Sequence, residues 1–249
     1  MSISVITAAT RPHLLKGLYD SLQDQDACWE WIIQLDGEGI AWQAAAEDDA
    51  WLADPRVRVE RNAKPYGSGT TRNQALARAT TDRIICVDDD DRLLPRCLGA
   101  LSRALHGHRE CFGAWGRTYT TKNGGKTHEL FRSWPGEYEA VLHAGTIGSL
   151  FEQRGLFAVH VGSVLWRREY LVAAGGYAAL PRSIDTNPFL ACEAIAPTVY
   201  VDLPVYLYHQ HDGQMTREQG YVEMRDRVHA LTFERAREVS RLFRASRPA

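Results

Sequence analysis

Four consecutive aspartates, Asp88 to Asp91, follow the short apolar run from Ile84 to Val87. Adjacent carboxylates repel one another, so a cation is expected to neutralise them. Because side chains alternate along a strand, Asp88 and Asp90 should project to one side and Asp89 to the other. Such an Asp-x-Asp pair suits Mg²⁺ or Mn²⁺, which completes its coordination with water and a phosphate or diphosphate. A solvated acidic turn is the alternative interpretation.

A glycine-rich stretch, Gly67 to Asn73, leads into a predicted helix, where a helix N-terminus could bind phosphate. It lacks the Gly-Lys-Ser/Thr of a P-loop, and Arg72 stands where a dinucleotide motif has its third glycine. The glycines alone favour a flexible loop. The guanidinium of Arg72 suits bidentate pairing with phosphate or carboxylate, with a structural salt bridge as the alternative.

Other polar side chains stand at predicted element ends. Asp36 follows an apolar run and precedes a glycine, a pattern that also fits a simple turn. Asp185 is either a helix cap or a general base, and Glu193, about two helical turns later, could share its face and that role. His209 and His211 would lie on one strand face, able to complete a metal shell or contact phosphate, or to serve structurally.

The elements that must position these residues alternate up to about residue 110, which predicts a mostly parallel sheet covered by helices. Predicted strands are 3–7, 30–35, 56–60 and 83–87, and predicted helices are 13–24, 40–52, 69–80 and 94–106. Ligands of such sheets bind outside the carboxyl ends of the strands. The stretch from Thr7 to Pro12, Asp36 with Gly37, and the acidic run all lie at such ends.

In the second half of the chain, strands and helices no longer alternate regularly. Strand-like stretches 111–120 and 126–132 flank a Lys-Asn-Gly-Gly turn, which indicates antiparallel additions. A helix is predicted within 183–196, beginning near Pro188, and a strand over 198–208. Segment 221–245 has helical apolar spacing and predicts a helix packed on the body, or alternatively a basic membrane-surface helix. We expect two halves of one domain, 1–110 and 111–216, and a helical extension, 217–249.

Composition limits the function classes. The net charge of −2 over 249 residues gives no general attraction to nucleic acid or anionic lipid. Five widely spaced cysteines fit reduced thiols and a cytoplasmic location. No apolar run approaches the roughly 20 residues of a membrane helix, and the first residues are already strand-like, so we expect a soluble protein without a signal peptide.

Taken in order, these motifs resemble the GT-A glycosyltransferases of family 2. The matching segments are Ser4-Val5-Ile6, Asp36-Gly37, Gly67 to Arg72-Asn73, Asp88 to Asp91 with Pro95, Gly162 to Arg168 with Gly175-Gly176-Tyr177, and Tyr208 to His211. Together they span roughly residues 3 to 216. The resemblance implies a mixed α/β sheet of Rossmann-like character flanked by helices, with a C-terminal helix.

The resemblance also implies roles for single residues. Asp36 would contact the base of a nucleotide sugar, with Thr7, Arg11 and Arg72 also at the nucleotide. Asp90, with Asp88 or Asp89, would hold the Mn²⁺ or Mg²⁺ ion on the diphosphate of the donor, and His211 is a further candidate ligand of that ion. Asp185 would be the catalytic base.

Three departures from the family pattern leave the nucleotide and the base open. Thr7-Ala8-Ala9-Thr10 replaces Pro-Thr-Tyr-Asn, Leu35-Asp36 replaces a paired Asp-Asp, and Ile184-Asp185 replaces Glu-Asp.

The expected function is metal-dependent transfer of a sugar, with inversion, from a nucleotide-diphosphate sugar to an acceptor hydroxyl. A UDP- or TDP-sugar is the expected donor, and a soluble natural product or saccharide the expected acceptor. The aromatic residues expected to form the acceptor wall, or part of the core, are Trp115, Trp134, Phe151 and Phe157. A nucleotidyltransferase and a non-catalytic nucleotide-sugar-binding protein are the alternatives.

Overall fold

The computed structural model describes residues 2–37, 50–122, 129–131, 140–211, 220 and 223–245. Its first half forms four parallel strands in the order β3, β2, β1, β4. Their bounds are β1 Ser2–Ala9, β2 Cys28–Leu35, β3 Val57–Arg61 and β4 Arg83–Cys86. All four predicted strands are confirmed. Their carboxyl ends lie at one edge of the sheet, as the placement of the polar residues requires.

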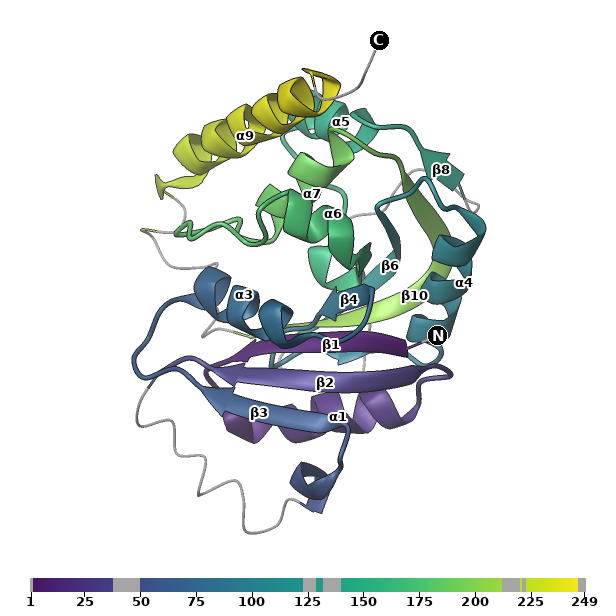
Figure 1. Cartoon of the computed structure of the whole chain (residues 1–249), viewed down its shortest axis with the longest axis vertical. Coiled ribbons are helices and arrows are strands. Elements are labelled where there is room, and N and C mark those ends of the chain that lie inside the picture. The colour runs from purple at the N-terminus through teal and green to yellow at the C-terminus, as the bar shows by residue number, and fades with distance from the viewer. Residues whose placement is uncertain are drawn as a thin grey trace.

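The sheet continues into the second half of the chain through an antiparallel strand, β9 (Leu165–Arg167), beside β4. Next come β6 (Gly113–Lys122), β10 (Thr198–Gln210) and the edge strand β5 (Arg92–Leu93). Two short strands, β7 (Glu129–Leu130) and β8 (Ala140–Leu142), pair with β6 and β10. Register shifts near Pro204 let β10 bend, and Figure 1 shows it curving away from β1 toward β8.

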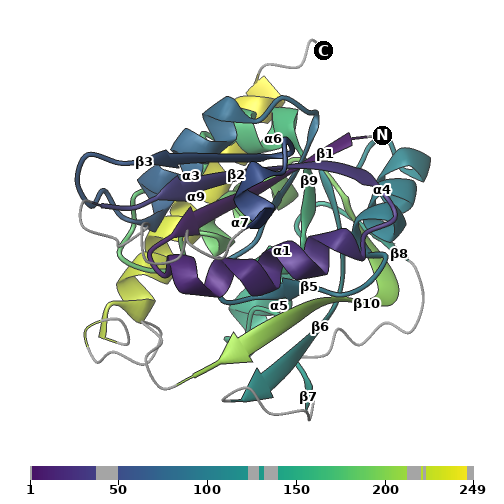
Figure 2. The same cartoon turned by 90° about the horizontal axis from the view of Figure 1, so that it is seen from below.

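Helices cover both faces of the parallel strands. Helix α1 (Leu15–Gln23) packs its buried leucines with Val5 and Ile33, which point to one face. Helix α3 (Ser68–Arg78) packs Ala75 and Leu76 with Ile6 and Ile32 on the other face. This division follows from the alternation of side chains along each strand. Figures 1 and 2 show α1 and α3 on opposite sides of the sheet.

The other helices have these bounds: α4 Cys97–Gly107, α5 Thr146–Arg154, α6 Arg168–Ala173, α7 Thr186–Glu193 and α9 Arg225–Ala245. Short 3₁₀ turns occupy Pro12–Leu14, Ala50–Ala53 and Val161–Ser163. Most of the predicted helix 40–52 lies outside the described residues. Helix α7 begins at Thr186, two residues before Pro188, which the first turn of a helix tolerates.

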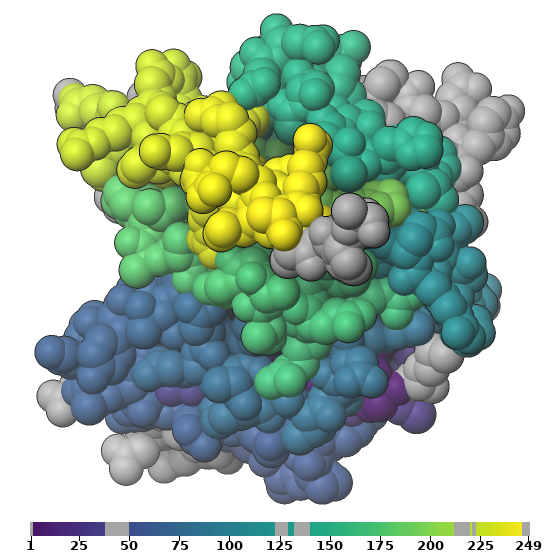
Figure 3. All heavy atoms as spheres, turned by 45° about the horizontal axis from the view of Figure 1, so that its top comes forward, coloured from purple at the N-terminus to yellow at the C-terminus, as the bar shows by residue number. Residues whose placement is uncertain are grey.

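Helix α9 packs on the body, as the sequence predicted. Val228, Thr232 and Ala236 are buried, and Asn187 on α7 donates to Thr232. The guanidinium of Arg235 donates to Asn187 Oδ1 and to the carbonyl of Ala174. Figure 3 shows α9, in yellow, covering part of the green segment that carries α7.

Three smaller expectations can be compared with the structure. The predicted antiparallel pairing is confirmed between β6 and β7, where Tyr119 lies opposite Leu130, and the predicted turn falls largely outside the described residues. The cysteines are all unpaired, and four of the five are buried. In the part of the chain that is described, none of the helices combines the length and apolarity needed to cross a membrane.

A close approach of backbone and ring at Gly162 gives a test of the packing. A Cβ built there would lie 2.5 Å from Tyr206 Cζ, because the tyrosine ring packs directly on the glycine backbone. We predict that Gly162→Ala lowers the free energy of unfolding by about 1–3 kcal/mol, the usual cost of overpacking. Chemical denaturation measures it. Gly107→Ala is the control, since nothing lies within 4 Å of its Cβ position, and equal stability of both variants would contradict the packing.

Candidate active site

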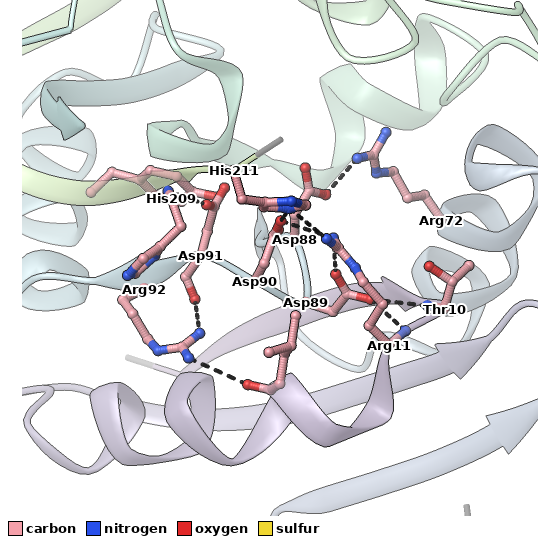
Figure 4. Close-up of polar contacts among 12 residues, drawn as sticks. Thr10, Arg11, Arg72, Asp88, Asp89, Asp90, Asp91, Arg92, His209 and His211 are labelled. Atoms are coloured by element: carbon pink, nitrogen blue, oxygen red, sulfur yellow. Dashed lines mark hydrogen bonds and ion pairs between the residues drawn. The ribbon is translucent and has the colours of Figure 1, made fainter. Parts of the chain in front are cut away.

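The acidic run forms a turn directly after β4, in which the amide of Asp91 donates to the carbonyl of Asp88 (3.2 Å). Asp89 points toward the end of β1, where its Oδ2 accepts the amides of Thr10 (3.0 Å) and Arg11 (2.9 Å). Asp89 and Asp90 share the guanidinium of Arg11, whereas Asp88 contacts Arg72, so the side chains of this turn do not follow the strand-like alternation that the sequence predicted. Figure 4 shows the cluster.

Two arginines from distant segments form ion pairs with this run. Arg11 Nη2 lies 2.5 Å from Asp89 Oδ1 and 2.9 Å from Asp90 Oδ2. Arg72 Nη2 lies 2.6 Å from Asp88 Oδ1. Burial raises the pKa of Asp88, but Arg72 outweighs it and holds that pKa below its ordinary value. The two guanidinium groups therefore offset part of the negative charge of the four carboxylates, and the metal ion stays a prediction.

The fourth carboxylate, Asp91, ties the run to the far strand. It is fully buried and accepts hydrogen bonds from Tyr206 Oη (2.7 Å) and the amide of His209 (2.8 Å), both on β10. Burial raises the pKa of Asp91 well above its ordinary value, and the neighbouring Asp90 and Asp88 raise it further. These bonds fix the end of β10 and so bring His211 to the cluster.

His211 lies between two charged partners. Its Nε2 is 3.0 Å from Asp90 Oδ2 and 2.8 Å from Arg11 Nη1. Arg11 can only donate and a carboxylate only accept, so a single ring nitrogen serves one of them at a time. Figure 4 shows the guanidinium of Arg11 pointing into this group.

Helix α3 links the acidic run to the second half of the chain. Arg72 on this helix binds Asp88. The side chain of the next residue, Asn73, makes two hydrogen bonds with the backbone of Tyr177. Its Nδ2 donates to the Tyr177 carbonyl (2.8 Å), and its Oδ1 accepts from the Tyr177 backbone N–H (2.9 Å). Gly176 in this turn has φ 64°, and an added Cβ would lie 2.4 Å from Asn73 Oδ1. The Arg-Asn and Gly-Gly-Tyr motifs therefore form one structural unit.

Asp36 organises the loop that leads into α3. Its oxygens accept the amides of Tyr66 (2.8 Å) and Gly67 (2.9 Å) and the side-chain amide of Asn62 (2.9 Å). Burial raises the pKa of Asp36, but these bonds outweigh it and hold the pKa below its ordinary value. Asp36 stays charged and half-buried at the sheet edge.

Two adjoining cavities open beside the acidic run. The inner one, of about 110 Å³, is lined by Arg72, Asp88, Tyr177 and Asp185 among others. The outer one, of about 550 Å³, includes Phe131, Phe151 and Phe157. Both cavities share the residues His160, Val161, Asp185 and Tyr208. Asp185 thus stands at the junction of the two.

A comparison with family models matches residues 4–171 to "Glycosyl transferase family 2", which is about two thirds of the chain. The chain belongs to glycosyl transferase family 2. It is on that ground a glycosyltransferase, not the nucleotidyltransferase weighed as an alternative. A comparison with curated protein sequences gave no significant match.

Solved structures share the fold. The S. aureus TarS 1–349 complex with UDP-GlcNAc superimposes with a TM-score of 0.70 at 15% identity, covering 98% of this chain and 71% of that one. The mannosyltransferase PcManGT from Pyrobaculum calidifontis, in complex with GDP-Man and Mn²⁺, has a TM-score of 0.60 at 15% identity, covering 95% and 64%. A longer TarS structure is covered over 37% of its length. The chain therefore has the GT-A fold, as the motifs implied.

The side chains at the acidic run include atoms that suit a divalent ion. Asp90 and His211 offer a carboxylate oxygen and an imidazole nitrogen only 3.0 Å apart, both with lone pairs suited to Mn²⁺. Within the described ranges, no group of three or more His, Cys, Asp or Glu side chains could hold a metal. Two protein ligands still match Mg²⁺ and Mn²⁺ sites that rely on substrate phosphates and water. For such an ion to bind there, the side chain of Arg11 would have to move away from Asp90 and His211.

Two members of the predicted site are buried among protein groups in this structure. The side chain of Thr7 is fully buried, and its hydroxyl accepts the indole N–H of Trp31 (2.9 Å), so it is a core residue. Asp89 is 3% exposed and binds the loop of Thr10 and Arg11. It therefore positions Arg11 and does not face a ligand directly.

The expectations for Glu193 and the aromatic wall also change. Glu193 is buried and accepts the amide of Ile147 (2.8 Å) at the start of α5, so it caps that helix and lines neither cavity. Trp115 packs on Tyr200 in the core, at 4.7 Å between ring centroids. Phe151 and Phe157 do line the outer cavity, and Trp134 lies outside the described residues.

Sequence reasoning missed His160 and the use of Tyr208. The His160 ring packs on Tyr206 (4.8 Å) and Tyr208 (4.7 Å), and His160 lines both cavities. No motif marks His160, because it stands alone in an irregular stretch. Only the closeness of β10 to the turn Val161–Ser163 brings it to the site.

The burial of Glu193 predicts a pH dependence of stability. Burial raises the pKa of Glu193 from 4.5 to about 7, against the opposing effect of the amides at the start of α5. The folded protein keeps this proton up to about pH 7, whereas the unfolded chain loses it near its ordinary pKa, so this stabilisation is present at acid pH and is lost as the pH rises.

We therefore predict that the free energy of unfolding of the wild type falls relative to Glu193→Gln between pH 4.5 and 7. The expected fall is roughly 3 kcal/mol, since a displacement of one pH unit is worth about 1.4 kcal/mol. Denaturation across pH measures it, with the exposed Glu152→Gln as control. If the free energy of unfolding changed with pH in the same way for the wild type and Glu193→Gln, the raised pKa of Glu193 would be contradicted.

Proposed function

We propose that the chain transfers a sugar from a uridine or thymidine diphosphate sugar to an acceptor hydroxyl, with inversion and with a divalent ion bound. The observation that carries this proposal is the position of Asp185, which lines the same 110 Å³ cavity as Asp88 and Arg72 and also opens to the larger cavity. A base thus lies between a site for a diphosphate and a site for a second substrate.

The donor diphosphate would bind at the acidic run. Arg11 and Arg72 are guanidinium groups that can pair with phosphate oxygens in two-point geometry. The TarS structures hold UDP and UDP-GlcNAc, and PcManGT holds GDP-Man with Mn²⁺. Those ligands support a nucleotide-diphosphate donor here, and the TarS complexes support uridine. Asp36 would approach the base, from the loop that it holds in place.

The chemistry follows from the two sides of the inner cavity. When the sugar–phosphate bond breaks, negative charge develops on the diphosphate, and Arg11 and Arg72 can stabilise it. Asp90 and His211, with Asp88 beside them, would hold a divalent ion, which would supply Lewis-acid stabilisation of the same charge. Asp185 would accept the proton of the attacking hydroxyl. Attack from the side opposite the diphosphate inverts the anomeric centre.

The acceptor would enter through the outer cavity. Phe131, Phe151 and Phe157 line it, and aromatic faces suit the apolar faces of sugars and natural products. We retain a soluble saccharide or small natural product as the proposed acceptor. The five unpaired cysteines support a cytoplasmic location.

Asp185→Asn tests the assignment of the base. Asp185 Oδ1 accepts a hydrogen bond from the backbone N–H of Thr186 (2.9 Å). Asparagine also caps helices well, so its side-chain oxygen can accept the same bond and the fold is kept. We predict a loss of about 10²–10⁴-fold in transfer rate, the usual worth of a general base, with unchanged affinity for UDP. Release of UDP from UDP-sugars over an acceptor panel measures the rate, and NMR reads the anomeric configuration.

The matched control is Asp20→Asn, which removes an exposed carboxylate on α1. Transfer at the wild-type rate by a folded Asp185→Asn protein would remove Asp185 from the reaction. A retained anomeric configuration would overturn the single-displacement mechanism.

A further inference from the structure

The outer cavity has two chemically different ends. Asp185, His160 and Tyr208 stand at the inner end, where the cavity adjoins the diphosphate side. Arg182 and Arg225 belong to the part of the lining that the inner cavity does not share. Among the described residues that line this cavity, Asp185 is the one carboxylate.

A histidine joins the two arginines. His229, on the second turn of α9, lines the cavity and packs its ring edge-on against Phe151, with ring centroids 5.0 Å apart. Burial lowers the pKa of His229, and the positive charges of Arg182 and Arg225 lower it further. The three basic groups are therefore close enough to act on one another.

The ion pair of Arg225 is exposed to water. Arg225 Nε lies 3.0 Å from Asp226 Oδ1, but these side chains are 57% and 87% exposed. A pair so exposed to water contributes little and is easily exchanged for another anion. The chain as a whole carries a net charge of −2, so the positive charge of Arg182 and Arg225 is a local feature of this cavity.

We propose that the acceptor carries an anionic oxygen group, phosphate or carboxylate, which Arg182 and Arg225 bind at the outer end of the cavity. The inference rests on the proposed function, because it treats this cavity as the acceptor site. The guanidinium group offers paired N–H donors that match phosphate and carboxylate geometry. Phe151 and Phe157 would contact the uncharged body of the acceptor.

The arrangement also orients the acceptor. Asp185 repels an anion, whereas Arg182 and Arg225 attract it, so the charged group is directed outward and a hydroxyl inward. A neutral acceptor of the same shape would lack this anchor and bind in more than one direction. The anionic group should therefore affect both affinity and the choice of reacting hydroxyl.

The test compares matched probes on the full chain saturated with UDP. Glucose 6-phosphate, glucuronate and glucose are titrated at low salt, and binding is followed by protein NMR. We expect at least one anionic probe to bind 10-fold or more tightly than glucose. In Arg182→Gln/Arg225→Gln that preference should disappear while affinity for glucose and for UDP is kept.

Arg227→Gln is the control, because Arg227 is an exposed arginine of α9 that does not line the cavity. A preference for glucose 6-phosphate alone assigns phosphate, and one for glucuronate alone assigns carboxylate. Equal binding of charged and neutral probes, or an equal loss in Arg227→Gln, overturns the inference. Failure of UDP to bind the wild type would instead contradict the proposed function, so the two failures are distinguishable.

Discussion

Four adjacent carboxylates at the end of a buried strand must be compensated, and this constraint organises the site. Asp88 is paired with Arg72 from α3, Asp89 and Asp90 with Arg11 from the end of β1, and Asp91 with hydrogen-bond donors on β10. Each pairing joins the turn to a different element. An unpaired charge at this depth would cost several kcal/mol, so the cluster holds three segments in fixed positions.

The same interactions prepare the site for a charged ligand. The guanidinium groups that pair with the carboxylates are also the groups that a diphosphate would bind, and Arg72 and Asp88 line the same cavity as Asp185. Through Asn73, helix α3 also holds the Gly-Gly-Tyr turn ahead of α7. The acidic run and the Gly-Gly-Tyr turn are therefore positioned by neighbouring residues of one helix.

Hydrophobic alternation was sufficient to predict the four parallel strands and most helices, because their periodicity reflects burial. The motif order was sufficient for the fold and the family. The direction of single side chains was harder to predict from the sequence. Thr7 lies near a strand end, yet its side chain points into the core toward Trp31. The side chain of Glu193 faces the start of α5. His160 could not be predicted, since its place depends on tertiary contacts with Tyr206 and Tyr208. Nor did the sequence reveal that Arg11 and Arg72 form ion pairs with the acidic run.

The account depends on the acidic run receiving both a metal ion and a diphosphate. A crystal structure with UDP and Mn²⁺, recorded at a wavelength that gives anomalous signal from manganese, tests this directly. The predicted result is a manganese peak between Asp90 and His211, with the diphosphate beside Arg72 and the Arg11 side chain turned away from Asp90. UDP bound elsewhere, with Arg11 still paired to Asp90 and no manganese at the run, would contradict it.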